Sequence, residues 1–306
     1  MTQAATPPTA DTVRRLIRSL LPESGPDVRP VTECGDHSSW WVGSRHVLRL
    51  APDRDASVRL RRELRLRDAV RPHVGLAVPV SIAHGEWGPG LGYTLDTRLH
   101  GVCAEEQDIS AVGEADLAGL LTGLREVTVR QAEVLGVPRV APRNLDTLRT
   151  AALRAAERLA ESDEFEAAGL SHFTAPAARQ LATQPGGAVL VHHGLRGEHL
   201  LVSPEGRVRG VLDWSGAVVG DPAEDIAGLA VAVGAPAAVR AATLAGYGAR
   251  PCLRGLWLAR CDTLLRLTAH TEGVAPGPLP LLQEQLGRAW EAILLERVTE
   301  FREGAP

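Results

Sequence analysis

Apolar residues that recur every three or four positions predict helices along much of this chain. The first predicted helix covers 10–21, where Val13, Ile17 and Leu20 share one face. After residue 101 the same spacing predicts further helices over 114–127, 144–160, 175–182, 223–233, 237–244, 253–270 and 281–301. The second part of the chain is therefore expected to be mainly helical.

Short apolar runs bounded by glycine and proline predict strands between residues 29 and 100. Two of them, Ser39–Val42 and His46–Leu50, flank Gly43-Ser44-Arg45, which is typical of a hairpin. Further strands are expected over 77–83 and 91–95, and an arginine-rich helix with a solvated basic face over 59–70. The pattern predicts an α+β fold, with a β-rich N-terminal lobe over 1–100, a helical C-terminal lobe over 101–306 and a ligand site between them.

One short β-element, residues 188–214, interrupts the helices of the second lobe. Its apolar runs cover 188–191, 200–202 and 208–212, and a polar loop and a hairpin turn join them. Asp213 follows the last run, and Asp221 stands at the expected cap of the next helix, with Pro222 in its first turn. Such a gathering of acids and histidines at strand ends indicates either a polar site for a metal or phosphate, or a solvated surface hairpin.

Composition narrows the class of protein. The 306 residues are 44% hydrophobic and 23% charged, as in ordinary globular proteins, and a net charge of −4 argues against nucleic-acid binding. No uncharged apolar run reaches the length of a bilayer span, and the first residues lack the features of a secretory signal. The four cysteines are widely spaced and are interpreted as free thiols. We therefore expect a cytoplasmic monomer or homodimer that acts on a small molecule, without a nucleic-acid or membrane partner.

The chain contains no lysine, so all of its 33 Lys and Arg residues are arginines. A phosphate-binding loop of the Walker type needs a lysine, and so does a Schiff base between protein and substrate. The sequence therefore excludes both kinds of site.

Two motifs carry a resemblance to a known family. Leu212-Asp213-Trp214, followed by Gly220-Asp221-Pro222 and Asp225, resembles the I-D-W and G-D-P-x-x-D motifs of the aminoglycoside phosphotransferase family. That family is the small-molecule branch of the protein-kinase-like fold, and the resemblance extends over roughly residues 10–300. It implies a bilobal kinase-like fold, with the catalytic segment in the hairpin 188–214.

The resemblance also implies a nucleotide site in the first lobe. The segment from Gly35 to Val42 resembles the loop that covers the nucleotide, which makes Gly35 and His37 candidate binding residues. Arg49 stands where kinases place the lysine that holds the α- and β-phosphates, and Glu63 is the expected partner of Arg49. If the protein is a phosphotransferase, its cofactors are Mg²⁺ and ATP or GTP; otherwise none is expected.

The catalytic segment gives the remaining implied roles. In this family Asp213 corresponds to the acid that binds Mg²⁺, and His199 replaces an asparagine ligand. Imidazole suits Mg²⁺ less well than oxygen does, although some family members carry histidine here. Asp221 and Asp225 correspond to acids that brace the catalytic loop. Late helices line the acceptor pocket in this family, so Arg260 and Asp262 are candidate substrate contacts.

The sequence departs from the family at the catalytic base. The family motif H-G-D-x-x-x-x-N places its aspartate at Gly194 when the asparagine is matched to His199, and a shift of one residue places it at Leu195. Neither register supplies an acid.

Three hypotheses follow from this departure. The fold could be repurposed for other acid–base chemistry in secondary metabolism, such as condensation or cyclisation, using His192, His193, Glu198 or Asp213. It could be an antibiotic phosphotransferase in which His193 or Glu198 replaces the base. It could also be a pseudokinase that binds a ligand without catalysis.

Overall fold

Five antiparallel strands build the sheet of the N-terminal lobe. The computed structural model describes residues 8–22, 27–31, 38–161, 170, 173–182 and 187–294. Within them the strands are β1 (Val28–Pro30), β2 (Ser38–Val42), β3 (His46–Leu50), β4 (Ser81–Gly88) and β5 (Leu91–Thr97), in the spatial order β1-β2-β3-β5-β4. The predicted hairpin is present, with Val42 opposite His46.

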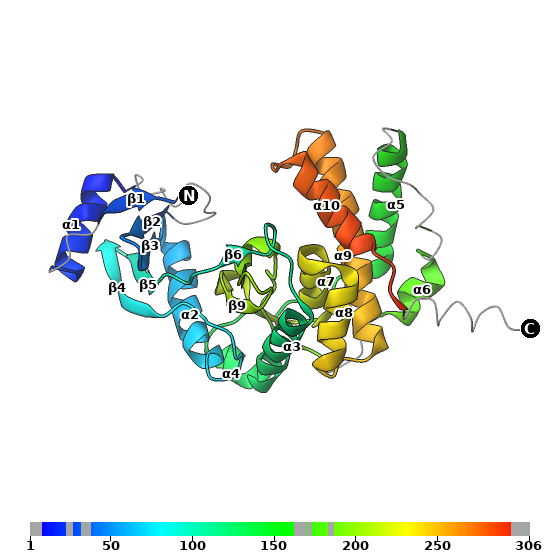
Figure 1. The fold of residues 1–306 in the computed structure, drawn as a ribbon, viewed down its shortest axis with the longest axis horizontal. Helices are drawn as coiled ribbons and strands as arrows, with labels where there is room; N and C mark the ends of the chain where they lie inside the picture. The colour runs from blue at the N-terminus through cyan, green and yellow to red at the C-terminus, as the bar shows by residue number, and fades with distance from the viewer. Residues whose placement is uncertain are drawn as a thin grey trace, which may run out of the picture.

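Two helices contact this sheet, one on each of its two faces (Figure 1). Helix α1 (Ala10–Leu20) buries Val13 and Ile17 in a cluster with Leu48 and Leu95. Residues next to these in β3 and β5 point to the other face, because side chains alternate along a strand. Helix α2 (Arg54–Val70) lies on that face, and its arginine side meets polar residues of the sheet.

Helix α2 is longer and less solvated than its pattern predicts. It begins at Arg54 because the Asp53 side chain accepts a hydrogen bond from the backbone N–H of Ala56 at 2.7 Å. Arg67 was expected on a solvated basic face, yet it is 1% exposed and pairs with Asp96 of β5. A charged residue is buried here because its partner is buried beside it.

Eight further helices, counted among the described residues, form the helical lobe. They are α3 (Ala111–Glu126), α4 (Val129–Val134), α5 (Leu145–Glu161), α6 (Ala175–Gln180), α7 (Ala223–Val233), α8 (Ala235–Leu244), α9 (Ala249–Thr271) and α10 (Leu279–Trp290). Helix α9 lies at the centre and packs against α5, α7 and α10. Buried side chains lie on all sides of α9, which is typical of a helix in the interior of a lobe.

A small β-element lies between the N-terminal sheet and these helices (Figure 1). It consists of the pair β7 (Val189–Val191) and β10 (Val218–Gly220), and the sheet of β6 (Val102–Cys103), β8 (Leu200–Val202) and β9 (Val208–Val211). Strands β7, β8 and β9 are the runs predicted over 188–214, and β6 and β10 join them from outside that range. Helix α2 also contacts it, because Arg62 Nη2 donates to the carbonyl oxygen of Ser215 at 3.0 Å.

Two predicted boundaries are wrong. The strand expected from residue 77 begins at Ser81, because Ala77 instead exchanges backbone hydrogen bonds with Arg209 and Val211 of β9. The helix expected over 281–301 is interrupted after Trp290, Ile293 is buried in the core, and residues 295–301 lie outside the described residues. Both breaks come from tertiary contacts that the local pattern does not contain.

The α+β class, with a β-rich first lobe and a mainly helical second lobe, is confirmed. The exact boundary near residue 100 stays a prediction. None of the helices in the described ranges has the length and apolarity needed to span a bilayer. The three cysteines within those ranges, Cys103, Cys252 and Cys261, are free thiols.

Two glycines of α3 should respond in opposite ways to alanine. A Cβ on Gly123 would lie 2.3 Å from the carbonyl oxygen of His73, whereas a Cβ on Gly119 would meet nothing within 4 Å. We expect Gly123→Ala to lower the free energy of unfolding by about 1–3 kcal/mol through overpacking. Gly119→Ala should raise it by about 0.5–1 kcal/mol, because alanine favours the helix. Urea denaturation of both variants measures this, and equal effects at the two positions would contradict the packing of α3.

Candidate functional site

An ion pair joins strand β3 to helix α2. Arg49 Nη1 donates to Glu63 Oε1 at 2.6 Å, with Glu63 buried and Arg49 mostly buried. Burial alone would lower the pKa of Arg49, but the Glu63 carboxylate raises it above its ordinary value. The sequence-predicted partners are therefore in contact, and Glu63 holds the Arg49 guanidinium close enough to Asp213 to lower the pKa of that carboxyl.

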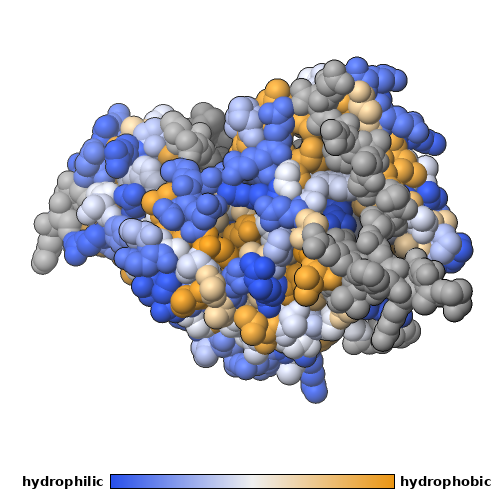
Figure 2. Space-filling model, turned by 45° about the vertical axis from the view of Figure 1, so that its right-hand side comes forward, coloured by the Kyte–Doolittle hydropathy of each residue, from blue (hydrophilic) through white to orange (hydrophobic). Residues whose placement is uncertain are grey.

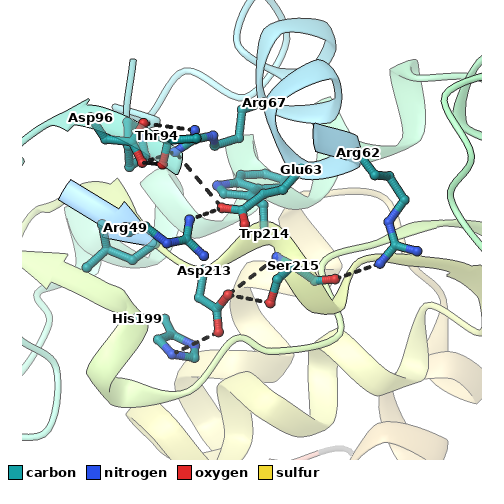
Figure 3. Close-up of polar contacts among 12 residues, drawn as sticks. Arg49, Arg62, Glu63, Arg67, Thr94, Asp96, His199, Asp213, Trp214 and Ser215 are labelled. Carbon is teal, nitrogen blue, oxygen red and sulfur yellow. Dashed lines mark hydrogen bonds and ion pairs between the residues drawn. The ribbon is translucent and has the colours of Figure 1, made fainter. Parts of the chain in front are cut away.

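A second layer of buried charge supports this pair. Arg67 donates to both carboxylate oxygens of Asp96, at 3.0 and 3.1 Å, and Thr94 Oγ1 donates to Asp96 as well. Arg67 Nη1 also lies 3.9 Å from Glu63 Oε1, so Glu63 stands between two guanidinium groups (Figure 3). The sequence analysis missed this layer, although Arg67 lies one helical turn after Glu63, and that spacing was a signal for it.

Asp213 lies at the end of β9 in an unusual backbone conformation. Its φ is 53°, in the left-handed region, and its Oδ1 accepts hydrogen bonds from Ser215 Oγ at 2.6 Å and from Ser215 N–H at 3.3 Å. Burial would raise the pKa of Asp213, but the Ser215 hydrogen bond and the positive charge of Arg49 lower it below its ordinary value. Asp213 is therefore an ionised, half-buried acceptor.

His199 turns one ring nitrogen towards Asp213. Its Nδ1 lies 2.7 Å from the carbonyl oxygen of Gly194, so Nδ1 carries the hydrogen of that bond. In the neutral ring Nε2 then has a lone pair, and this atom lies 3.6 Å from Asp213 Oδ2 and 3.6 Å from Glu198 Oε1. Figure 3 shows Asp213 between His199 and the Arg49–Glu63 pair.

These donors fit a cation that also binds phosphate. Two ligands that each lie about 2.1 Å from one ion stand roughly 3–4 Å apart, which includes the separation of His199 Nε2 and Asp213 Oδ2. Within the described part of the chain no group of three or more metal-ligating side chains exists. A cation here would therefore complete its coordination with phosphate oxygens and water, as Mg²⁺ does in nucleotide sites.

Asp225 fixes the start of the loop that carries these groups. Its two carboxylate oxygens accept hydrogen bonds from the backbone N–H groups of His192 and His193, both at 2.8 Å. His193 adopts a φ of 60° and presents its side chain to solvent. Burial raises the pKa of Asp225 to about 7, against the lowering effect of the two N–H donors. The family role implied for Asp225 is compatible with these contacts.

His192 is buried, which argues against the catalytic role predicted for it. It is 0% exposed, its ring packs edge-on against Trp214 with ring centroids 4.6 Å apart, and its Nε2 donates to the carbonyl oxygen of Leu212 at 3.0 Å. Burial lowers its pKa to about 3, so the ring is neutral at pH 7. In this arrangement His192 is a packing residue of the loop and cannot touch a substrate.

Gly194 has room for a side chain. A Cβ on it would lie 3.5 Å from His192 Nδ1 and 3.8 Å from His199 Nδ1, which are ordinary contact distances. Its φ is not in the left-handed region, where a side chain would be strained. The lack of a side chain at this point is therefore a property of the sequence and is not imposed by the fold.

Two glutamates lie beside the loop. Glu198 is about half exposed, and its Oε1 lies 3.6 Å from both His199 Nε2 and Arg196 Nη1. Glu105 follows β6 and was missed in the sequence analysis. Its side chain packs directly against Gly197, because a Cβ on Gly197 would lie only 2.5 Å from Glu105 Cγ. Burial and the charge of Glu198 raise the pKa of Glu105. The only local signal was Gly197, because a glycine permits such close approach.

Asp221 anchors the turn before α7. The helix begins at Ala223, so Pro222 takes the cap position and Asp221 lies one residue earlier than its sequence pattern predicted. Asp221 still accepts the N–H of Ala223 at 3.0 Å, and its other oxygen accepts from the buried Arg254. This buried ion pair, to which α9 contributes Arg254, was not foreseen from the sequence.

The predicted substrate contacts are occupied by protein partners. Arg260 is 8% exposed, donates to the carbonyl oxygen of Ala289 and lies over the ring of Trp290. Asp262 accepts two hydrogen bonds from Arg143, at 2.6 and 3.0 Å. Their contact with substrate stays a prediction. Gly35 and His37 lie outside the described residues.

Comparison with known proteins decides the family. The family model of the phosphotransferase enzyme family, APH, matches residues 27–256. The chain belongs to this family. No curated protein matches the sequence.

Solved structures of phosphotransferases share the fold. The wild-type aminoglycoside 2'-phosphotransferase-IIIa in its GDP complex has a TM-score of 0.65 and 17% identity, covering 90% of this chain and 96% of its own. The macrolide 2'-phosphotransferase MphH from Brachybacterium faecium has a TM-score of 0.59 and 21% identity, covering 91% and 98%. The kinase-like fold expected from the sequence motifs is confirmed.

The buried His192 of this phosphotransferase-family chain should make stability sensitive to acid. Its folded pKa of about 3 lies below the ordinary value of 6.5, so the unfolded chain binds the extra proton first. Stability is then complete above pH 6.5 and is lost as the pH falls from 6.5 towards 3, by roughly 2 kcal/mol at pH 5. His192→Gln keeps a donor for Leu212 and removes the titration.

Urea denaturation at pH 7 and pH 5 measures this effect. The fall in the free energy of unfolding between the two pH values should be smaller in His192→Gln by roughly 2 kcal/mol. Identical falls in both proteins would show that His192 does not titrate as its burial requires.

Proposed function

We propose that this protein transfers the γ-phosphoryl group of ATP or GTP to a hydroxyl group of a small molecule. The observation that carries the proposal is the assembled charge arrangement: the Arg49–Glu63 pair faces Asp213, which faces His199 (Figure 3). Phosphoryl transfer depends mainly on positioning and on neutralising phosphate charge. This arrangement serves both needs from residues of both lobes.

Each group has a role in the transfer. Arg49 would bind the α- and β-phosphates, and Glu63 with Arg67 behind it would hold its guanidinium in place. Asp213 and His199 would hold a divalent cation, which neutralises phosphate charge when bound. The acceptor oxygen bonds to the γ-phosphorus as the bond from that phosphorus to the β–γ bridging oxygen breaks. A phosphomonoester and ADP or GDP are formed, and the hydroxyl proton leaves to a base.

This site has no acid at the position of the family's catalytic base, because Gly194 stands where the family motif carries aspartate. Of the two substitutes that we consider, Glu198 is favoured over His193, because Glu198 Oε1 lies 3.6 Å from His199 Nε2 at the metal pair. A positioned base contributes about 10²- to 10⁴-fold to rate. We therefore infer a slow phosphotransferase.

The acceptor class is inferred from the relatives. Structures of similar fold include an aminoglycoside phosphotransferase with kanamycin and macrolide phosphotransferases. Figure 2 shows hydrophobic surface in the middle of one face, next to the hydrophilic surface of the N-terminal lobe. Hydroxyl-bearing antibiotics of these two classes are thus the first acceptors to test.

A second candidate function is favoured by Gly194 itself. If the kinase chemistry was given up, the same site would carry another acid–base reaction on a small molecule, with His193, Glu198 and Asp213 as the proton-transferring groups. The space beside Gly194 would then be occupied by part of the substrate. This alternative does not need a nucleotide, which separates it from the first proposal.

Nucleotide binding tests the first proposal directly. Mg·ATP or Mg·GTP should raise the melting temperature, and Asp213→Asn should abolish the shift because it removes the charge that holds the cation. Differential scanning fluorimetry measures both. If neither nucleotide shifts the wild type with any divalent cation, the phosphotransferase proposal fails and the repurposed enzyme is favoured. A shift without turnover on any acceptor would favour a pseudokinase.

Restoring an acid at position 194 tests the missing base. Gly194→Asp has room for its side chain, so the variant should fold and should raise nucleotide-dependent phosphorylation of an accepted substrate by about 10²-fold or more. Gly194→Asn is the matched control, with equal size and no proton-accepting carboxylate. Equal rates in wild type, Asp and Asn variants would show that position 194 is not where the base acts.

A further inference from the structure

The backbone holds the nitrogen donor of the cation site, His199, in one orientation. The carbonyl oxygen of Gly194 accepts a hydrogen bond from the N–H of Arg196 at 2.8 Å, and it lies 2.7 Å from His199 Nδ1. A carbonyl has no hydrogen to donate, so Nδ1 must carry the hydrogen of the second bond. The ring is thereby oriented, and Nε2 carries the lone pair.

That lone pair is directed at carboxylate oxygens. Asp213 Oδ2 and Glu198 Oε1 each lie 3.6 Å from His199 Nε2, too far for a hydrogen bond and suitable for a shared ion. The His199 side chain is 18% exposed, so it keeps this position, whereas Glu198 is half exposed and can move. The protein therefore offers a cation one imidazole nitrogen and at least one carboxylate oxygen.

We infer that the imidazole of His199 gives this site a preference for a transition-metal cation, Mn²⁺, over Mg²⁺. Mg²⁺ is a hard ion that takes oxygen ligands, whereas Mn²⁺ belongs to the first-row series of divalent metals that also bind at sites with a nitrogen donor. Mn²⁺ also accepts carboxylate and phosphate oxygens, so it satisfies the whole donor set. The inference rests on the proposed nucleotide site, since phosphate oxygens complete the coordination.

The structure also supplies the backbone support for the preference. The His192 and His193 N–H groups bind Asp225, which fixes the chain just before Gly194 and with it the carbonyl that orients His199. Leu195 is 1% exposed and anchors the next residue in the core. The nitrogen donor is thus placed by the fold and does not depend on the ligand to order it.

Electron paramagnetic resonance tests the inference without turnover. Mn²⁺ is titrated into the protein with a non-hydrolysable ATP or GTP analogue, and Mg²⁺ is then added as competitor. The selectivity for Mn²⁺ over Mg²⁺ should fall on the order of tenfold in His199→Asn, which replaces the nitrogen donor by an oxygen donor. The analogue without protein gives the intrinsic preference of the phosphates.

Pulsed measurements of the same samples identify the ligand. The Mn²⁺ signal should show coupling to an imidazole nitrogen in wild type and in Glu198→Gln, and lose it in His199→Asn. Melting temperatures without metal confirm that the variants are folded. Mn²⁺ bound without nitrogen coupling, or equal selectivity in wild type and His199→Asn, overturns the inference while leaving the nucleotide site intact.

Failure of the proposed function gives a different result. In that case neither Mn²⁺ nor Mg²⁺ would make the analogue bind to wild type, and Asp213→Asn would change nothing. Binding of the analogue with both cations but without a His199-dependent preference separates the two outcomes.

Discussion

The buried carboxylate of Asp225 holds the loop of the candidate site together. It accepts the N–H groups of two successive residues, His192 and His193, at 2.8 Å each, from the first turn of a core helix. This contact supports the left-handed backbone of His193, which turns the chain so that Gly194 presents its carbonyl to His199. His199 in turn faces Asp213. The buried side chain of Leu195 adds a second attachment of this loop to the core.

The N-terminal lobe meets this segment through a separate set of buried charges. Asp96, Arg67, Glu63 and Arg49 alternate in sign from the sheet through helix α2 and back to the sheet. Buried ion pairs add little stability compared with apolar packing, but losing one partner costs about 3–5 kcal/mol. Their value here is geometric, because they aim the Arg49 guanidinium at the side of the site that Asp213 occupies.

In the proposed function, the site would have the groups that neutralise phosphate charge but no aspartate at the family's base position. The fold leaves room for a side chain on Gly194. Since phosphoryl transfer depends more on electrostatics than on a base, such a site can keep part of its activity. The imidazole of His199 would change which cation the proposed site prefers, and the fold that holds the site would stay the same.

The sequence by itself determined the helical and strand segments, the two-lobe fold and the identity of the residues at strand ends, because these follow from local periodicity and from motifs of short range. The resemblance to the family implied that Arg49 pairs with Glu63 and that Asp213 and His199 share a cation. Only the tertiary structure decided that His192 is buried and neutral, that Arg67 pairs with Asp96, and that Glu105 lies over Gly197. Each of these depends on the contact of segments distant in the chain, and on the desolvation that such contact produces, which no local pattern records.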